Sequence, residues 1–481
     1  MNSFSKQISS LRHFGRTLLL ISTALLTVSC AAIPNLGPAK QVQPAESYAA
    51  TESFKAPAAE WPADEWWKAY GDDQLNELVA EALAGGPSLK DAEARVRQAD
   101  ALAQEAGAAR LPQVQGSAAF SEVKQSYNAG IPAVVVPKGW NETAQINLSF
   151  SYEFDFWGKN RASLNAALSS AEAARADQAQ ARLTLAAVVA AAYADLAQLY
   201  ADRDASLDAV TVRTRTVELL TQRFAQGLEN QGAVKRAEAG RASAEAELAA
   251  IDEAVALTKN RIAALVGAGP DRGMTIMPPQ ALQLKSFGLP ANLKADLIGR
   301  RPDIQASRLR AEAAAQRINV AKADFYPNVS LSGLIGLQSL GLGALTKAGS
   351  DYGSFGPAIT LPIFTGGRLQ GAYRAANAEY DSAVAAYDAA VVQALHDVAD
   401  VAASERALTQ RLQSSRAALD ASDQAYQTML NRYLGGLSTY LDVLSSEDSL
   451  IANRQTVADL ETRAFALDVA LVRALGGGFH N

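Results

Sequence analysis

Cysteine and histidine are nearly absent from this chain, whose 481 residues include one cysteine, Cys30, and three histidines. A single cysteine forms no disulfide within a chain, and zinc sites and histidine-based catalytic sites need several such side chains together. The sequence also contains no recognisable catalytic motif, so we expect no enzyme activity, no cofactor and no bound metal. The low counts of cysteine and histidine do not exclude an enzyme whose catalytic site uses serine or aspartate.

Long apolar runs and a strong charge imbalance are also missing. After Cys30 the chain has no run of 18 or more consecutive apolar residues, so we expect no transmembrane helix in the mature protein. If that protein spans a membrane, it does so as strands closed into a barrel. The net charge of −6 argues against a nucleic-acid partner, and the 7% content of aromatic residues favours long alanine-rich helices over a compact all-β protein.

The N-terminus has the pattern of an export signal. Three basic residues and a short apolar run precede Cys30, which predicts a signal peptide over residues 1–29. The letters LTVSC, ending at Cys30, resemble the lipobox of bacterial lipoproteins, although Thr27 stands where leucine is usual. The resemblance implies that Cys30 carries fatty acyl chains, palmitate among them, which anchor the protein to a membrane. The alternative is ordinary cleavage near Ala32, which discards Cys30.

Prolines mark two matching segments of the chain. Pro112 follows Pro87, and Pro327 follows Pro302, at the same separation, with an alanine-rich helical pattern between them. Proline suits the first turn of a helix and also stops one. Each segment continues with two strand-like runs, a very long helix and a return helix, which indicates an internal duplication. The expected strands are residues 113–123, 144–157, 328–337 and 352–364, and the expected long helices are residues 161–226 and 368–434.

The predicted organisation has five parts. A long helix of about 65 residues would form a rod of roughly 100 Å, which is typical of packed helical pairs rather than of a compact core. The parts are a signal peptide (1–29), an N-terminal acylated linker (30–65), a first repeat (66–267), an inter-repeat linker (268–290) and a second repeat (291–481).

The second strand-like run, which includes INLSFSYEFDFW at residues 146–157, alternates apolar and polar side chains. A period of two predicts a strand with one apolar face and one polar face. If lipid covers the apolar face, the polar row faces a water-filled lumen. That row contains Asn147, Ser149, Ser151, Glu153 and Asp155.

Four strands are too few to enclose a polar lumen, because the smallest bacterial barrels use about eight. Their unpaired edges would also be costly in lipid. We therefore expect several chains to share one barrel with cyclic symmetry. The alternative is a small soluble sheet covered by helices, in a lipid-anchored periplasmic scaffold without a pore.

Seven motifs together resemble the TolC-like outer membrane factors, and specifically the NodT/OprM-like branch of efflux lipoproteins. The resemblance implies an α+β membrane protein in the cell outer membrane, a homotrimer with a twelve-stranded β-barrel to which each chain gives four strands. A long α-helical tunnel continues the barrel into the periplasm. The motifs are LTVSC, WWKAYGDDQLNELVAEAL, SYEFDFWGKNRASLNAA, GLPANLKADLIGRRPDI, LPIFTGGRLQGAYRAA, RYLGGLSTYLDVLSSE and ALGGG.

The same resemblance implies a passive exit duct for drugs or other small toxic compounds. Its partners are outer membrane lipid, a periplasmic adaptor protein and an inner-membrane efflux pump of the RND type, with no nucleic acid. A type I protein secretion duct is the alternative within this class.

The resemblance also places the closed end of the tunnel. Gly227 and Gly436 match the turns between helices at the periplasmic tip. Three copies of Asp442 would form an acidic ring, which favours cations, although an acid near a helix start is also stabilised by the helix dipole. Leu441 either constricts the aperture or packs between helices. The residues matched to the aperture are Leu441, Asp442, Ser445 and Tyr433.

Overall fold

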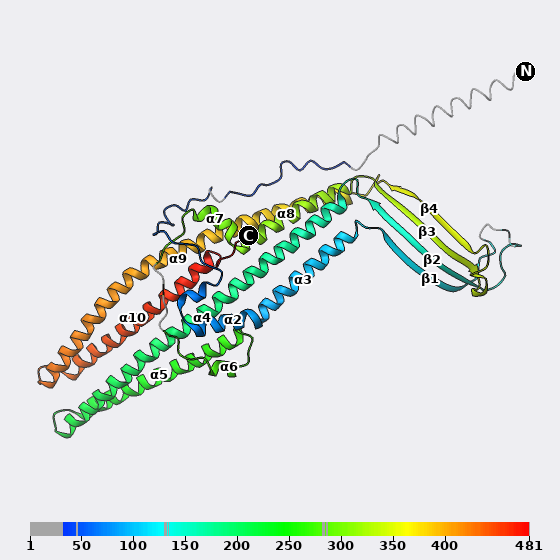
Figure 1. The fold of residues 1–481 in the computed structure, drawn as a ribbon. Coiled ribbons are helices and arrows are strands. Elements are labelled where there is room, and N and C mark those ends of the chain that lie inside the picture. Colours follow the sequence, from blue (N-terminus) through cyan, green and yellow to red (C-terminus); the bar gives the residue numbers. More distant parts are fainter. Residues whose placement is uncertain are drawn as a thin grey trace, which may run out of the picture. The chain divides into compact units, whose positions relative to one another are not determined.

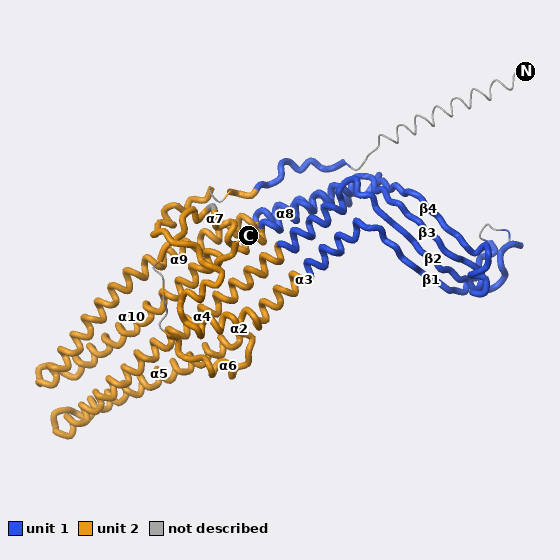
Figure 2. The backbone as a smooth tube through the Cα atoms, in the orientation of Figure 1, with its two compact units in different colours: residues 1–41, 98–172, 308–385 blue, residues 42–97, 173–307, 386–481 orange. Residues whose placement is uncertain are grey.

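The computed structural model describes residues 32–480 apart from 45–46, 129–131, 133, 281–283 and 285–286, so the expected signal peptide and Cys30 lie outside it. The chain divides into two compact units, each assembled from three stretches of sequence (Figure 2). Both units draw on both halves of the chain. Unit 1 comprises Met1–Gln41, Gln98–Glu172 and Arg308–Ala385, and unit 2 comprises Val42–Arg97, Ala173–Ser307 and Ala386–Asn481.

The helices repeat in length between the two halves. Helices α3 and α8 each have 22 residues, α4 and α9 each have 67, and α5 and α10 each have 35. Figure 1 shows α4 turning back into α5, and α9 into α10, as two helical hairpins. The helix bounds are α3 Pro87–Ala108, α4 Lys159–Ala225, α5 Gln231–Leu265, α8 Pro302–Ala323, α9 Arg368–Leu434 and α10 Tyr440–Ala474.

Shorter elements fill the connections. They are the 3-10 helices η2 (Trp66–Tyr70) and η3 (Leu342–Ala344), and the helices α2 (Asp73–Gly85), α6 (Asp271–Met274) and α7 (Leu293–Arg300). As expected, α3 and α8 begin at Pro87 and Pro302, where the missing N–H of proline has no intrahelical partner to lose.

One four-stranded antiparallel sheet, with strand order β1-β2-β3-β4, lies in unit 1 (Figure 1). Strand β1 matches the expected bounds, whereas β2 starts and ends three residues before its prediction. Strand β4 stops at Thr360, earlier than predicted, because Thr360 pairs with Asn328, the first residue of β3. The strands are β1 Gln113–Val123, β2 Asn141–Phe154, β3 Asn328–Leu340 and β4 Asp351–Thr360.

The strand register gathers apolar residues on one face of the sheet. Ile146 of β2 pairs with Ala118 and Leu337, and Phe154 pairs with Val329. Because partners in a ladder point to the same side, the apolar row of β2 continues across the sheet. This face is open to solvent in the single chain: the side chains of Val114, Phe120, Ile146, Ile335, Phe355 and Ile359 are all at least half exposed.

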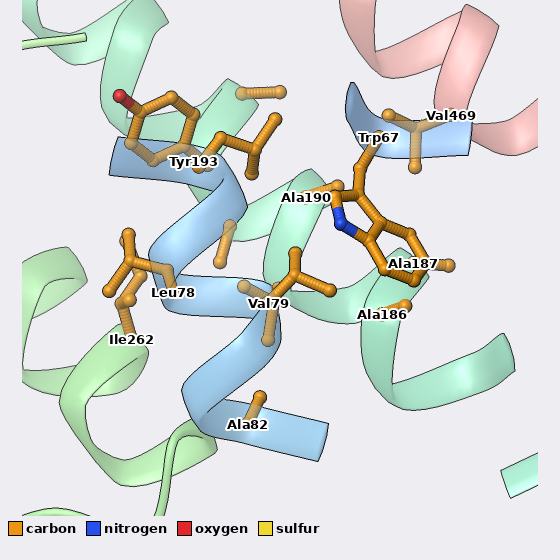
Figure 3. Close-up of a cluster of buried hydrophobic side chains, with 14 of the residues drawn as sticks. Trp67, Leu78, Val79, Ala82, Ala186, Ala187, Ala190, Tyr193, Ile262 and Val469 are labelled. Carbon is orange, nitrogen blue, oxygen red and sulfur yellow. The ribbon is translucent and has the colours of Figure 1, made fainter. Parts of the chain in front are cut away.

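The largest hydrophobic core of unit 2 joins α2, α4, α5 and α10. Figure 3 shows Leu78 and Val79 of α2 packed with Tyr193 of α4 and Ile262 of α5, and all four side chains are fully buried. The hydroxyl of Tyr193 donates to Asp72 at 2.8 Å, and this buried carboxylate also caps the start of α2. Alanine-rich faces let these helices approach closely.

Among the described helices, α4 is the one with an 18-residue stretch apolar enough to cross a membrane. Within that stretch 56% of the residues are buried inside the chain. Val189, Tyr193 and Leu196 have no exposed surface. This stretch therefore packs as a core helix.

Candidate functional site

Two turns at the ends of the helical hairpins have the same backbone geometry. Gly227 and Gly436 have φ angles of 72° and 73°. After each glycine, the N–H of the next residue donates at 2.8 Å to the carbonyl five positions back, from Leu228 to Arg223 and from Leu437 to Arg432. This is the Schellman helix ending, and glycine adopts its left-handed conformation without strain.

The start of α10 is held by a reciprocal capping box. The backbone N–H and the hydroxyl of Thr439 both donate to Oδ2 of Asp442, at 2.9 and 2.8 Å, and the N–H of Asp442 lies 3.4 Å from the Thr439 hydroxyl. The hydrogen bond from the Thr439 side chain, followed by that from its backbone, lowers the pKa of Asp442. The carboxylate is therefore charged, solvent-exposed and held in one orientation.

Three of the four residues matched to the aperture lie together. Leu441, Asp442 and Ser445 are all exposed in the first two turns of α10, and the side chain of Leu441 is 55% exposed. Tyr433, unlike them, is buried: only 4% of its surface is exposed, and the guanidinium of Arg223 sits 4.6 Å from the centre of its ring.

A buried apolar cluster joins the two hairpins just behind these turns. It contains Leu220 of α4 and Val234 of α5, and Tyr433, Tyr440 and Val443 from the other hairpin. The rings of Tyr433 and Tyr440 lie 6.4 Å apart. A movement that separates the hairpins at this level has to expose this cluster.

A buried ionic site, not predicted from the sequence, lies one turn further along α10. Glu447 is fully buried, and its Oε2 accepts a hydrogen bond of 3.1 Å from the Thr216 hydroxyl of α4. Nε of Arg213 lies 3.1 Å from Oε1 but makes no aligned hydrogen bond with it. Another nitrogen of Arg213 pairs with the half-exposed Asp448. Burial raises the pKa of Glu447, and the nearby Arg213 opposes that shift.

A glycine inside helix α5 makes room for this arginine. A Cβ atom at Gly240 would lie 3.3 Å from Nη1 of Arg213. Glycine in a helix interior costs about 1 kcal/mol relative to alanine, so its use here fits a packing requirement. The signal in the sequence was Glu447 at a core position of α10, three or four residues from the buried Val443 and Leu450.

The polar face of the sheet carries four of the five predicted lumen residues. Asn147 accepts a hydrogen bond of 2.8 Å from the Ser117 hydroxyl, and Ser149 donates at 3.2 Å to the carbonyl of Gln115. Ser151 and Glu153 share this face by the alternation of β2. These bonds tie neighbouring strands together across the polar row.

Asp155, the fifth residue, lies beyond the end of β2. Its two carboxylate oxygens accept hydrogen bonds from the backbone N–H groups of Asn160 and Arg161, at 3.1 and 2.9 Å. The carboxylate therefore satisfies two free N–H groups at the start of α4. This role explains why the strand stops at Phe154.

A carboxyl pair between α4 and α10 gives a prediction about pH. Burial, followed by the nearby Asp459, raises the pKa of Asp202 to about 6. The folded state therefore binds more protons than the unfolded state, so this contribution to stability is present in acid and is lost as the pH rises through about 6.

We expect Asp202→Asn to remove this pH dependence. Between about pH 5 and about pH 7.5 the wild type should lose roughly 1 kcal/mol of unfolding free energy relative to the variant, a value reduced for the partial exposure of the pair. Urea unfolding at both pH values, followed by far-UV circular dichroism, measures the difference. Equal pH slopes in the two proteins would show that the pKa of Asp202 is not raised by burial and Asp459.

Comparison with known proteins gives matches along most of the chain. The model of the family described as outer membrane efflux protein matches twice, over residues 78–268 and 293–477. The fusaric acid resistance protein FusA of Burkholderia cepacia is 35% identical over 75% of this chain and 69% of its own length. The multidrug resistance outer membrane protein MdtP of Escherichia coli K12 is 28% identical over 97% of this chain and 98% of its own.

Solved structures give the same result. The outer membrane protein VceC from Vibrio cholerae superposes with a TM-score of 0.81 and 48% sequence identity, covering 87% of this chain and all of that one. The mixture of long helices with one four-stranded sheet is thus the fold of an outer membrane channel.

Proposed function

The chain belongs to the outer membrane efflux protein family, and from this membership we propose that three copies form the exit duct of a tripartite efflux system. The expectations of an outer membrane location, of a TolC-like fold and of an efflux role are confirmed by the family match and by the relatives named above. Within this role the duct acts passively and without catalysis.

The main support for a trimer is the four-stranded sheet, which has an unpaired strand at each edge. One face of the sheet is apolar and exposed while the other is polar, so the sheet suits a position between lipid and water. Within the described part of the single chain, strands β1 and β4 each lack a partner on one side. Pairing β1 of one copy with β4 of the next closes twelve strands into a barrel and leaves no edge in lipid.

We also assign a periplasmic aperture to the start of α10. Leu441, Asp442 and Ser445 would line it, with Leu441 as the apolar constriction and three copies of Asp442 as an acidic ring. Exposed apolar side chains at the two tip turns, Leu228 and Leu437, support a contact with an adaptor at this end. Drugs or other small toxic compounds delivered by an RND-type pump are the proposed cargo, and acylated Cys30 is the proposed anchor.

Single-channel conductance in a planar bilayer tests the duct and its gate. If the resting duct is closed at Leu441, the wild type should show small openings and Leu441→Ala should raise the conductance severalfold. Asp442→Asn should lower cation selectivity, because it removes the ring charge and keeps a side chain able to cap α10. Asp420→Asn, at another exposed acid on α9, is the control with the same change of charge.

Two other results of the conductance measurement would change this proposal. A large conductance that is unchanged in Leu441→Ala keeps the duct but moves the gate away from α10. Folded wild-type protein that forms no channels supports the lipid-anchored scaffold and contradicts the proposed function.

A further inference from the structure

A groove in unit 1 lies between the start of α4 and the end of α8. Its volume is about 590 Å³, within the range of small-ligand sites. The lining mixes exposed rings, side-chain amides and two cations, which is unlike the alanine-rich surfaces elsewhere on these helices. The residues that matter are Phe156, Trp157, Tyr326, Arg161, Lys322 and Asn319.

The groove adjoins the apolar face of the sheet. The ring of Phe156 stacks on Phe154, the last apolar residue of β2, with ring centres 5.7 Å apart. Trp157 stacks on Tyr326 at 4.6 Å, and its indole N–H donates at 2.7 Å to the carbonyl of Pro327. The polar group of the indole is thus satisfied within the chain. The rings of Phe156 and Trp157 nevertheless remain more than half exposed.

Positive charge in the groove exceeds negative charge. Arg161 pairs with Asp155 at 3.2 Å, and the neighbouring Lys159 pairs with Asp324 at 2.8 Å. Lys322 is exposed and makes no ion pair with any described residue. One uncompensated ammonium group therefore lies beside exposed rings and exposed side-chain amides, a combination that suits an anionic amphiphile. The amide of Asn319 donates one N–H to Oε1 of Gln316 at 3.3 Å, and its second N–H can bind a ligand.

A neighbouring copy does not cover this groove if the barrel closes as proposed. Its walls lead out of β2 and into β3, which are the two central strands, whereas the proposed contacts between copies are made by β1 and β4. The groove also lies just past the strand ends on the helical side, where aromatic side chains of membrane barrels meet the lipid headgroups.

We propose that this groove binds the headgroup of an anionic phospholipid from the leaflet on the helical side of the barrel. The Lys322 ammonium pairs with the lipid phosphate, the amide of Asn319 hydrogen-bonds to the headgroup, and the exposed rings contact the first part of the acyl chains. This site rests on the proposed orientation of the sheet, with its apolar face toward lipid.

Native mass spectrometry of the assembled protein, titrated with phosphatidylglycerol or phosphatidylethanolamine, tests the site. The wild type should retain phosphatidylglycerol in preference to phosphatidylethanolamine. Lys322→Gln should weaken that retention by about fivefold, the effect of one basic side chain at a membrane surface. Lys322→Arg should keep it. Lys347→Gln is the matched control, because Lys347 is an exposed lysine in the loop between β3 and β4, at the opposite ends of the strands.

Equal retention of the two lipids, or no loss in Lys322→Gln, overturns the proposal. Displacement of phosphatidylglycerol by inorganic phosphate also overturns it, since the groove would then be a simple anion site. Conductance of the same preparations separates this result from the proposed function. If channels form but show no lipid preference, only the proposed lipid site is contradicted. If the protein is folded but forms no channels, both the proposed duct and the proposed lipid site are contradicted.

Discussion

Replacing Arg213 with methionine should lower the free energy of unfolding by about 3 kcal/mol, because it leaves the fully buried Glu447 carboxylate without a cation. Thr216 alone would then hold the charge through one hydrogen bond. Since this site joins α4 to α10, the loss should appear first as separation of the two hairpins near the tip. Urea unfolding followed by far-UV circular dichroism measures the change in the helices.

A double variant distinguishes the buried charge from lost packing. In Arg213→Met with Glu447→Leu both charges are gone and apolar side chains fill the space, so stability should return to near that of the wild type. Acid should also rescue the single variant, because burial raises the pKa of Glu447 and protonation removes the uncompensated charge.

Arg416→Met provides the matched control. Arg416 of α9 likewise pairs with a glutamate of α10, Glu461, at 2.7 Å, but both side chains are at least half exposed. The loss should stay below about 1 kcal/mol. If the Arg213 single and double variants are equally unstable, the site contributes packing and the ionic interpretation is wrong.

Local patterns explain how far the fold was predictable. The proline before β1 and the prolines at the starts of α3 and α8 are short-range signals, and the structure has those elements at the expected residues. Strand β2 ends earlier than its alternation indicated, because Asp155 caps α4 instead of continuing the ladder. A period of two continues through such a residue in the sequence, and only the position of the next helix shows where the strand stops.

Among the residues of the candidate site, those set by local geometry were also predictable, and those set by distant partners were not. Gly227 and Gly436 were predictable as turn residues, because a left-handed helix ending requires glycine at a definite place. The sequence TYLD also contains the capping box in which Asp442 takes part. The partner of Glu447 was not predictable, since Arg213 lies in the other repeat. The groove proposed to bind lipid was not predictable either, since it combines Lys322 and Trp157 from distant parts of the chain.

The second large effect on stability is expected at the glycines near the end of the chain. Gly476 has a φ of 91°, and a Cβ atom there would lie 2.0 Å from the carbonyl oxygen of Arg300. Beside this contact, the buried Arg301 donates at 3.1 Å to the carbonyl of Ala474 and pairs with Asp397 at 2.9 Å. The end of α10 is thus fixed to the junction of α7 and α8 by a backbone approach that only glycine permits.

Gly476→Ala should therefore cost about 3 kcal/mol or more in unfolding free energy, since left-handed strain adds to a clash with rigid backbone. Gly436→Ala is the matched control: its φ of 73° gives comparable strain, but no atom lies within 4 Å of the added Cβ. That change should cost only about 1 kcal/mol. The difference between the two unfolding free energies measures the contact with the backbone of Arg300 and Arg301. Equal losses would show that the end of α10 moves freely to admit a side chain, and that the contact with α7 does not hold it.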